Sequence, residues 1–240
     1  NDHVRGNQVF SPDVQIIATT QTREAIRRVE PDQIKWEIQN APQLLIATQE
    51  SLDDETDPLR RRDLLLQVAY YKAVTNPHCE LKQRLPNLTF ENKLTIQGTT
   101  RKVELLHLGG GHTPGDCILL LPDEHIAFVG DLVSIGMHPY MPDGVLEEWK
   151  VSLRELEDLL LGTIVPGHGP VGDRVDITFM LDYFQSLQRL ATNMVFSQKD
   201  DDDIPSEPIP PQYQPWLHKQ NFLPNLRYLY SQTEGALGKR

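Results

Sequence analysis

The chain has 240 residues, of which 39% are hydrophobic and 24% are charged, and its formal net charge at pH 7 is −11. This length and composition are typical of a globular protein with enough chain to bury a sizeable core. The excess of negative charge repels phosphate backbones, which disfavours nucleic acid as a partner. No apolar run reaches the roughly 20 residues that a membrane-spanning helix needs. We therefore expect neither a nucleic-acid nor a membrane partner.

The cysteines and the first residue bear on the compartment. The two cysteines, Cys79 and Cys117, cannot define a disulfide framework, and they slightly favour a reducing compartment such as the cytoplasm. The sequence begins at Asn1 without Met and without a signal-peptide pattern, which we interpret as loss of the true N-terminus. The sequence therefore assigns no compartment.

The first third of the sequence predicts one short strand followed by helices. A β-branched segment precedes a segment with helical spacing, and a later helix has Asp57 as its N-cap and Pro58 at its first position. That helix carries an apolar stripe that includes Leu64 and Val68. The predicted elements are a strand over 14–20 and helices over 21–30, 41–55 and 57–75, with 32–40 ambiguous.

From residue 88 the hydrophobic pattern predicts two hairpins and then alternation of strand and helix. The hairpins pair 88–98 with 101–111 and 116–122 with 124–131; a helix over 146–162, a strand over 163–169, a helix over 175–198 and a helical segment over 221–232 follow. This order predicts a mixed α/β fold of the α+β kind, with mostly antiparallel pairing.

Composition also suggests where the domain ends. We predict one domain over residues 1–198, an acidic and Pro-rich linker over 199–216, and a C-terminal segment over 217–240 whose helix docks on the body. The four consecutive aspartates at 200–203 are interpreted as a solvated run rather than a metal site.

Three glycine-rich segments place metal-binding side chains near the ends of predicted strands. His112 follows three glycines in HLGGGHTPGD, Asp131 lies in FVGDL, and His168 lies in VPGHGP. Each could serve an ordinary turn, but together with Asp2 and His3 they form a set of imidazoles and carboxylates that suits Zn²⁺, Mn²⁺ or Fe. Because strand-end loops on a rigid scaffold are common places for sites, the set predicts a metal centre.

These motifs resemble a known family. DHVRGN at 2–7, HTPGD at 112–116, VGD at 129–131 and PGHG at 166–169 resemble, in order and spacing, the motifs of the metallo-β-lactamase superfamily. The resemblance extends to about residue 195, and the lid-like loop after residue 135 and the tail are most similar to the hydrolase branch of quinoprotein relay systems.

The resemblance implies an αββα sandwich that is N-terminally incomplete in this chain. The family's first motif is H-x-H-x-D-H, and Asp2 and His3 match its last two letters. The two earlier histidines and the first strands are then expected upstream of Asn1. Loss of those strands would expose an apolar sheet face, which favours homodimerisation or aggregation.

The resemblance also implies a ligand set. Asp2, His3, Asp131 and His168 would hold one metal, with Asp131 bridging to a second metal that His112 binds. Two Zn²⁺ ions are expected for a full-length chain, with Mn or Fe as alternatives. Without the two upstream histidines, we expect one metal at most and little activity from this chain.

The implied chemistry is hydrolysis of a small ester, thioester, lactone or related bond. Metal coordination lowers the pKa of bound water to near neutrality and so supplies a hydroxide nucleophile. Asp2 would orient that hydroxide and then protonate the leaving group, which makes it the catalytic residue. Asp116 would either orient a ligand imidazole or stabilise its turn.

The loop after Asp131 bears on the substrate. His138 and Tyr140 either contact substrate or pack in the loop. Family members that hydrolyse β-lactams often carry Lys where Ser134 stands, and many carry Cys where Asp131 stands. Both differences disfavour β-lactam hydrolysis.

Two further interpretations stay open on the sequence. One is a mononuclear-iron oxidoreductase of the persulfide-dioxygenase kind, which the loop after Asp131 fits poorly. The other is a non-catalytic fragment or binding domain. Metal content separates the first from a dinuclear hydrolase, and turnover separates the second from both.

Overall fold

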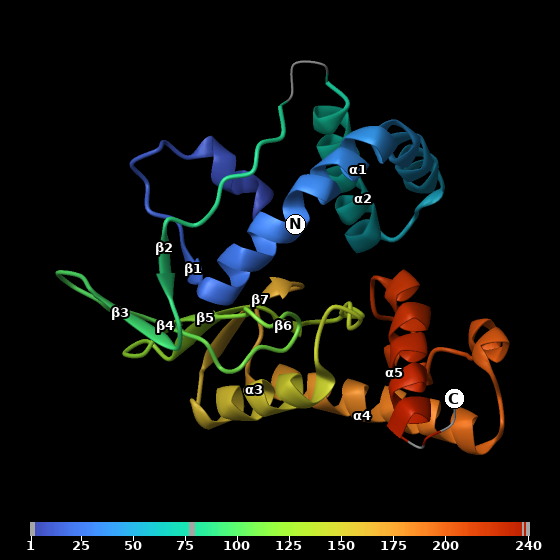
Figure 1. Ribbon diagram of the computed structural model, residues 1–240. Helices are drawn as coiled ribbons and strands as arrows, with labels where there is room; N and C mark the ends of the chain where they lie inside the picture. The colour runs from blue at the N-terminus through green and yellow to red at the C-terminus, as the bar shows by residue number, and fades with distance from the viewer. Residues whose placement is uncertain (1–2, 77–79, 237, 239–240) are drawn as a thin grey trace. The chain divides into compact units, whose positions relative to one another are not determined.

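The computed structural model describes residues 3–76, 80–236 and 238. The chain forms two compact units, residues 1–89 and residues 90–240 (Figure 1). The mixed class with mostly antiparallel pairing is confirmed. Within the described ranges, no helix has both the length and the apolar character that crossing a membrane requires.

The first unit is a helical hairpin with a small sheet. It contains η1 (Arg5–Val9), β1 (Ile17–Thr19), α1 (Thr20–Asp54), α2 (Pro58–Val74) and β2 (Leu88–Phe90), and β1 pairs with β2. The ambiguous stretch 32–40 is helical, so the two predicted helices are one element that contains Pro31 and Pro42. Proline removes a backbone donor and crowds the preceding turn, which agrees with the bend of α1 in Figure 1.

The start of α2 is as predicted. The Asp57 side chain accepts a hydrogen bond of 3.0 Å from the backbone N–H of Arg60, and Pro58 is the first helical residue. The predicted apolar stripe is buried, because Leu64 and Val68 pack with Leu52 of α1 in a small core of their own. The two helices of the hairpin are thus joined by apolar contact.

The second unit contains a five-stranded sheet in the order β3-β4-β5-β6-β7. Its strands are β3 (Lys93–Gln97), β4 (Lys102–Leu106), β5 (Ile118–Leu121), β6 (Ile126–Ser134) and β7 (Thr163–His168). Antiparallel pairing of β3 with β4 and of β5 with β6 confirms both hairpins, although residues 88–90 pair with β1 instead of extending β3. β6 and β7 are parallel, which brings their carboxyl ends to the same edge.

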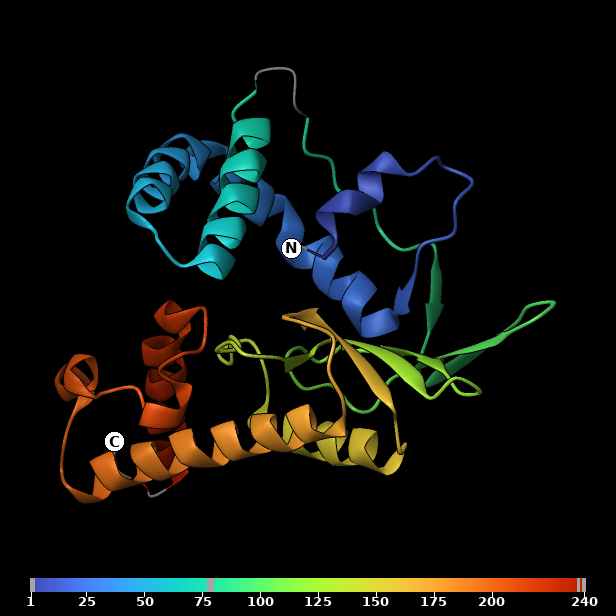
Figure 2. The ribbon, with the colours of Figure 1, turned by 180° about the vertical axis from the view of Figure 1, so that it is seen from behind.

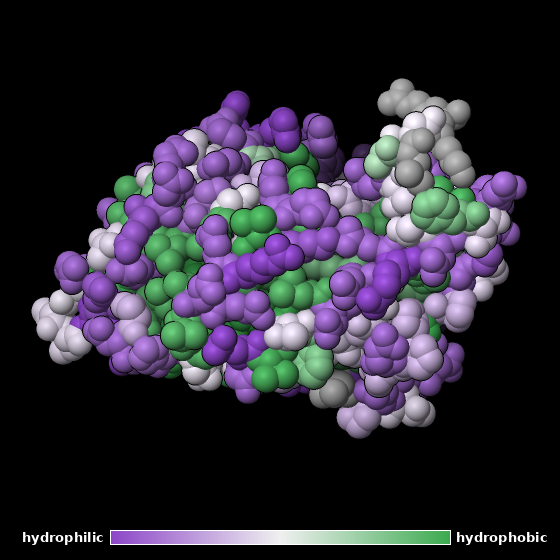
Figure 3. Space-filling view, turned by 90° about the horizontal axis from the view of Figure 1, so that it is seen from below, coloured by the Kyte–Doolittle hydropathy of each residue, from purple (hydrophilic) through white to green (hydrophobic). Residues whose placement is uncertain are grey.

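Helices cover one face of this sheet. α3 (Leu146–Asp158) and α4 (Arg174–Phe196) lie along β6 and against each other, as Figures 1 and 2 show from opposite sides. Trp149 and Leu153 of α3, Phe184 of α4, and Val129 and Val133 of β6 are fully buried in the core. The outer face on the side of α3 and α4 mixes hydrophobic with hydrophilic residues (Figure 3).

The C-terminal part returns to α4. Residues 199–216 contain the 3₁₀ helices η2 (Asp201–Ser206) and η3 (Pro211–Tyr213), and Ile204 and Tyr213 are buried in the same core as α4. Asp200 caps η2 by accepting from the backbone N–H of Asp202. After η4 (Lys219–Asn221), α5 (Phe222–Ala236) packs on α4. The domain boundaries at 198 and 216 stay a prediction.

Candidate metal centre

Three segments of the second unit carry the predicted ligands. His112 lies between β4 and β5, Asp131 lies in β6, and His168 is the last residue of β7. The predicted strand ended at Asp131, but β6 continues to Ser134 because shifts of register around Gly130 let its pairing with β7 resume. The parallel pairing of these two strands therefore places Asp131 and His168 at one edge of the sheet.

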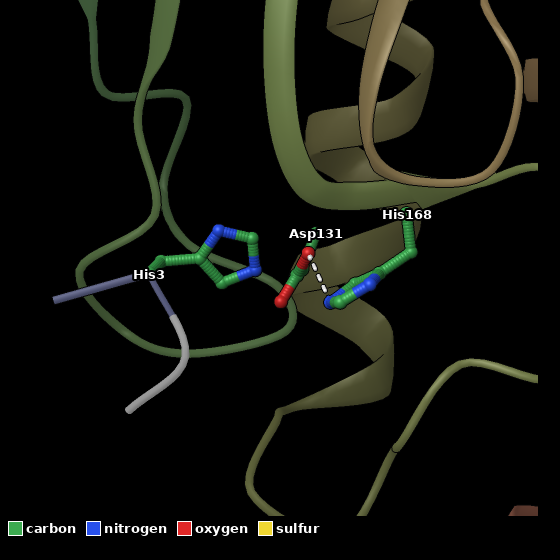
Figure 4. Close-up of side chains that lie close together, drawn as sticks. All are labelled: His3, Asp131 and His168. Atoms are coloured by element: carbon green, nitrogen blue, oxygen red, sulfur yellow. Dashed lines mark ion pairs between the residues drawn. The ribbon is translucent and has the colours of Figure 1, made fainter. Parts of the chain in front are cut away.

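The Asp131 carboxylate faces two imidazoles. Oδ1 lies 3.5 Å from Nε2 of His168, and Oδ2 lies 3.7 Å from Nδ1 of His112. Figure 4 shows Asp131 and His168 pointing toward one another. Two atoms that bind one tetrahedral zinc, each about 2.1 Å from it, lie roughly 3.4 Å apart. Each oxygen of the Asp131 carboxylate therefore has one imidazole nitrogen close to the spacing of two ligands on one ion, and these donor types suit a divalent cation.

Glycine makes this approach possible. A Cβ atom on Gly167 would lie 1.9 Å from Oδ1 of Asp131 and 2.8 Å from the carbonyl carbon of Gly130. A Cβ atom on Gly111 would lie 2.7 Å from the Leu132 side chain and 2.9 Å from the ring of Trp149. The glycines beside the two histidines are thus needed for close packing.

The ring of His112 is positioned by the core. It meets the ring of Trp149 edge to face, with centroids 5.6 Å apart. Trp149 is fully buried, and its indole N–H donates a hydrogen bond of 2.9 Å to the carbonyl of Leu132. Since Leu132 follows Asp131, one tryptophan links the histidine loop to the strand that carries the carboxylate.

Asp116 stabilises the turn after His112. Its carboxylate accepts from the backbone N–H of Thr113 at 3.0 Å and from the Thr113 hydroxyl, and burial raises its pKa. Its carbonyl accepts from the His107 ring. These are the contacts expected of the turn-stabilising alternative, and a role of Asp116 in orienting a ligand imidazole stays a prediction.

His138 packs in the core. It is 1% exposed; its Nδ1 lies 2.9 Å from the hydroxyl of Tyr183, and its Nε2 lies 3.2 Å from the carbonyl of Tyr213. Burial lowers the pKa of His138 to about 4, so the ring is neutral at pH 7. His138 therefore takes the packing alternative. Tyr140 is exposed, and its contact with substrate stays a prediction.

The N-terminal ligands stay predictions. Asp2 lies outside the described residues, and His3, which Figure 4 also labels, belongs to the first unit.

One histidine was not predicted. The ring of His218 lies edge to face with that of His168, with centroids 6.1 Å apart, and its backbone is left-handed with φ 55°. A non-glycine residue in this conformation is uncommon and is often found at functional sites. The sequence offers no signal for it, because His218 stands alone in a Pro-rich stretch.

Comparison with known proteins identifies the family. A profile of the metallo-beta-lactamase superfamily matches residues 48–168, which is about half of the chain. The chain belongs to this superfamily. The family resemblance is thereby confirmed; the matched segment includes the motifs at 112–116 and 129–131 and reaches His168, whereas the motif at 2–7 lies outside it. Membership supports a metal-dependent protein of the hydrolase kind.

Individual relatives agree with this assignment. The chain is 31% identical over 105 residues to metallo-beta-lactamase type 2 of Bacillus cereus, and 30% identical over 105 residues to the type 2 enzyme of Bacillus sp. (strain 170). Each match covers 42% of this chain and 38% of the relative, so the chain matches well under half of either enzyme.

A solved structure extends the likeness of fold over most of the chain. It is a metallo-beta-lactamase family protein from Thermus thermophilus, which matches with a TM-score of 0.55 and 14% identity. The match covers 93% of this chain and 68% of that protein. The metallo-β-lactamase-like fold is therefore confirmed.

Proposed function

We propose that this protein is a metal-dependent hydrolase that acts on a small ester, thioester, lactone or related bond. The observation that carries the proposal is the placement of His112 and His168 on opposite oxygens of Asp131. Three segments distant in sequence supply this donor set within one compact unit. Structural turns alone would not require two imidazoles to meet one carboxylate in this way.

Asp131, His112 and His168 are the proposed ligands from the second unit, and Asp2 and His3 are added on the strength of the sequence motif. We propose one divalent cation for this chain, with zinc as the first choice because the donors are nitrogen and carboxylate oxygen. When bound, such a cation supplies Lewis-acid polarisation of the scissile bond and activation of water.

The chain's own side chains bind the cation, transfer the proton and contact the substrate in this proposal. Asp131 offers both carboxylate oxygens to ligand positions, and Trp149 holds the ring of His112 beside it. Asp2 is the proposed proton carrier, which accepts a proton from the attacking water and returns it to the leaving group. Tyr140 is exposed on the loop after β6 and is the proposed contact to substrate.

Metal content and turnover test this proposal together. The wild-type chain and the variants His112→Ala, Asp131→Asn and His168→Ala would be loaded with zinc, dialysed and analysed for bound metal. We expect about one zinc per wild-type chain, substantial loss in each variant, and a decrease of roughly a hundredfold or more in hydrolysis of an ester, thioester and lactone panel. His125→Asn is the matched control, because Asn tolerates the left-handed backbone of His125.

The other outcomes contradict the proposal in distinct ways. Well under one metal per wild-type chain would exclude the metal site. One tightly bound iron per chain, with oxygen consumption in the presence of a persulfide, would favour the dioxygenase alternative. Stoichiometric zinc without turnover of any panel member would favour a binding domain.

A further inference from the structure

A buried arginine joins the N-terminal segment to α1. Arg5, in η1, is 8% exposed, and its Nη1 lies 2.6 Å from Oε1 of Glu30. Its Nε and Nη2 lie 3.2 Å and 3.1 Å from the two carboxylate oxygens of Glu37. Glu30 and Glu37 are themselves buried. The guanidinium thus donates one hydrogen bond to Glu37 and one to Glu30, and a second ion-pair contact joins it to Glu37, so this two-point contact with Glu37 and the contact with Glu30 fix its orientation.

The second helix of the hairpin completes this cluster. The hydroxyl of Tyr70, in α2, donates a hydrogen bond of 2.7 Å to Oε2 of Glu37. Burial, followed by the hydrogen bond to Glu37, raises the pKa of Tyr70 to about 12, so the hydroxyl keeps its proton. η1, α1 and α2 therefore meet at Glu37. We call Arg5, Glu30, Glu37 and Tyr70 the Arg5 cluster.

Stability alone is a weak explanation for such a cluster. Removing charges from water is costly, and well-packed apolar residues often replace a buried ion pair without loss of stability. Hydrogen bonds and ion pairs are directional, so they specify one geometry more strictly than apolar packing does. The geometry specified here is that of the backbone at Arg5, two residues after His3.

A second arginine, Arg84, anchors a different part of the N-terminal segment. Arg84 donates to backbone carbonyls farther along, at 3.2 Å to Asn7, 2.7 Å to Ser11 and 3.1 Å to Val14. Arg84 therefore anchors residues 7–14, while the Arg5 cluster anchors the residues that adjoin His3.

We propose that Arg5 is a positioning residue, which fixes the turn carrying His3 on the α1–α2 hairpin so that the imidazole is preorganised to bind metal. The inference rests on the proposed function, in which His3 is a metal ligand. A ligand held in one orientation before binding loses less conformational freedom when the metal arrives. Groups that orient metal ligands typically contribute tenfold to a hundredfold to metal affinity.

A double-mutant cycle between Arg5 and His3 tests the inference. Zinc affinity would be measured on the whole chain by competition with a chromophoric chelator, for Arg5→Met, His3→Ala and the double variant. We expect Arg5→Met to weaken zinc binding on the order of tenfold to a hundredfold. In the His3→Ala background, the same substitution should change affinity by less than about threefold. The visible spectrum of bound Co²⁺ should change in both single variants, because each alters the same ligand.

Conservative and control variants separate positioning from folding. Arg5→Lys keeps the charge without the planar fork and should recover part of the affinity. Arg84→Met, which loosens the same segment elsewhere, and Arg27→Met, which removes an exposed arginine of α1, should show no coupling to His3. If Arg5→Met does not fold, Glu37→Gln replaces it, because it leaves the arginine in place and weakens the two-point contact. It must then show the same loss that depends on His3.

The possible failures are distinguishable. If His3→Ala weakens zinc binding and Arg5→Met does not, the inference is overturned and the proposed function stands. Equal losses from Arg5→Met with and without His3 would show a general structural role and would also overturn it. If His3→Ala leaves zinc binding unchanged, the proposed ligand set fails, and the inference fails with it.

Discussion

The Asp131 carboxylate fills the space that a side chain at position 167 would need: a Cβ atom on Gly167 would lie 1.9 Å from Oδ1 of Asp131. Gly167→Ala should therefore displace the carboxylate, or push β7 away from the backbone of β6, without removing any ligand. We expect metal affinity to fall on the order of tenfold to a hundredfold and the unfolding free energy to fall by about 1–3 kcal/mol. Isothermal titration with zinc and urea denaturation measure the two effects.

Gly162→Ala is the control for this substitution. Its Cβ would meet only the His125 carbonyl at 3.8 Å, an ordinary contact, so metal affinity should be unchanged. Wild-type zinc affinity in Gly167→Ala would mean that the carboxylate position is unimportant for binding.

Trp149 should couple the core to metal binding. In Trp149→Phe the carbonyl of Leu132 loses its indole donor and the ring of His112 loses part of its edge contact. We expect a loss of about 1–3 kcal/mol in the free energy of unfolding, and weaker zinc binding with all ligands present. Trp216→Phe, which changes a ring stacked on Tyr183, should lower stability without changing zinc affinity. Parallel zinc titrations of the two variants decide the point.

His138 should make stability depend on pH in a defined direction. Burial lowers its folded pKa from 6.5 to about 4, so between these values the unfolded chain binds a proton that the folded chain does not. Its contribution to stability is therefore full above pH 6.5 and is lost as pH falls toward 4, by about 3 kcal/mol at most.

The difference in unfolding free energy between wild type and His138→Gln isolates this effect, because the carboxyl groups of the chain titrate equally in both proteins. Urea denaturation with a chelator present should show the wild-type advantage shrinking between about pH 7 and about pH 4. An advantage that stays constant over this range would show that His138 is not a buried neutral base.

Asn225 should anchor the loop after β6. Its fully buried side chain donates a hydrogen bond of 2.7 Å to the carbonyl of Pro139 and accepts one of 2.8 Å from the N–H of Met141. Asn225→Ala leaves both of these backbone groups without a hydrogen-bond partner, which should lower the free energy of unfolding by about 1–3 kcal/mol for each group. The matched control Asn221→Ala removes one half-buried hydrogen bond to His138 and should cost about 1 kcal/mol. Thermal unfolding of the two variants should rank them in this order.

Local patterns predicted most elements of the fold. The hairpin turns, the amphipathic spacing of α3 and the Asp57–Pro58 start of α2 are encoded within a few residues, so they could be recognised from the sequence. The continuity of α1 through Pro31 and Pro42 could not, because intrinsic preference disfavours an interior proline and packing against α2 opposes that preference. The extension of β6 past Asp131 likewise depends on pairing with β7.

By itself, the sequence determined the family and the candidate ligands, because glycine, histidine and aspartate in fixed local motifs carry their chemistry wherever the chain places them. Only the tertiary structure decided how they are used. It placed Asp131 between His112 and His168, assigned His138 to packing and Asp116 to a turn, and brought His218 beside His168. It also buried Arg5 against two glutamates of α1. The physical reason is that contacts between residues distant in the chain depend on strand register and helix packing, which no local spacing records.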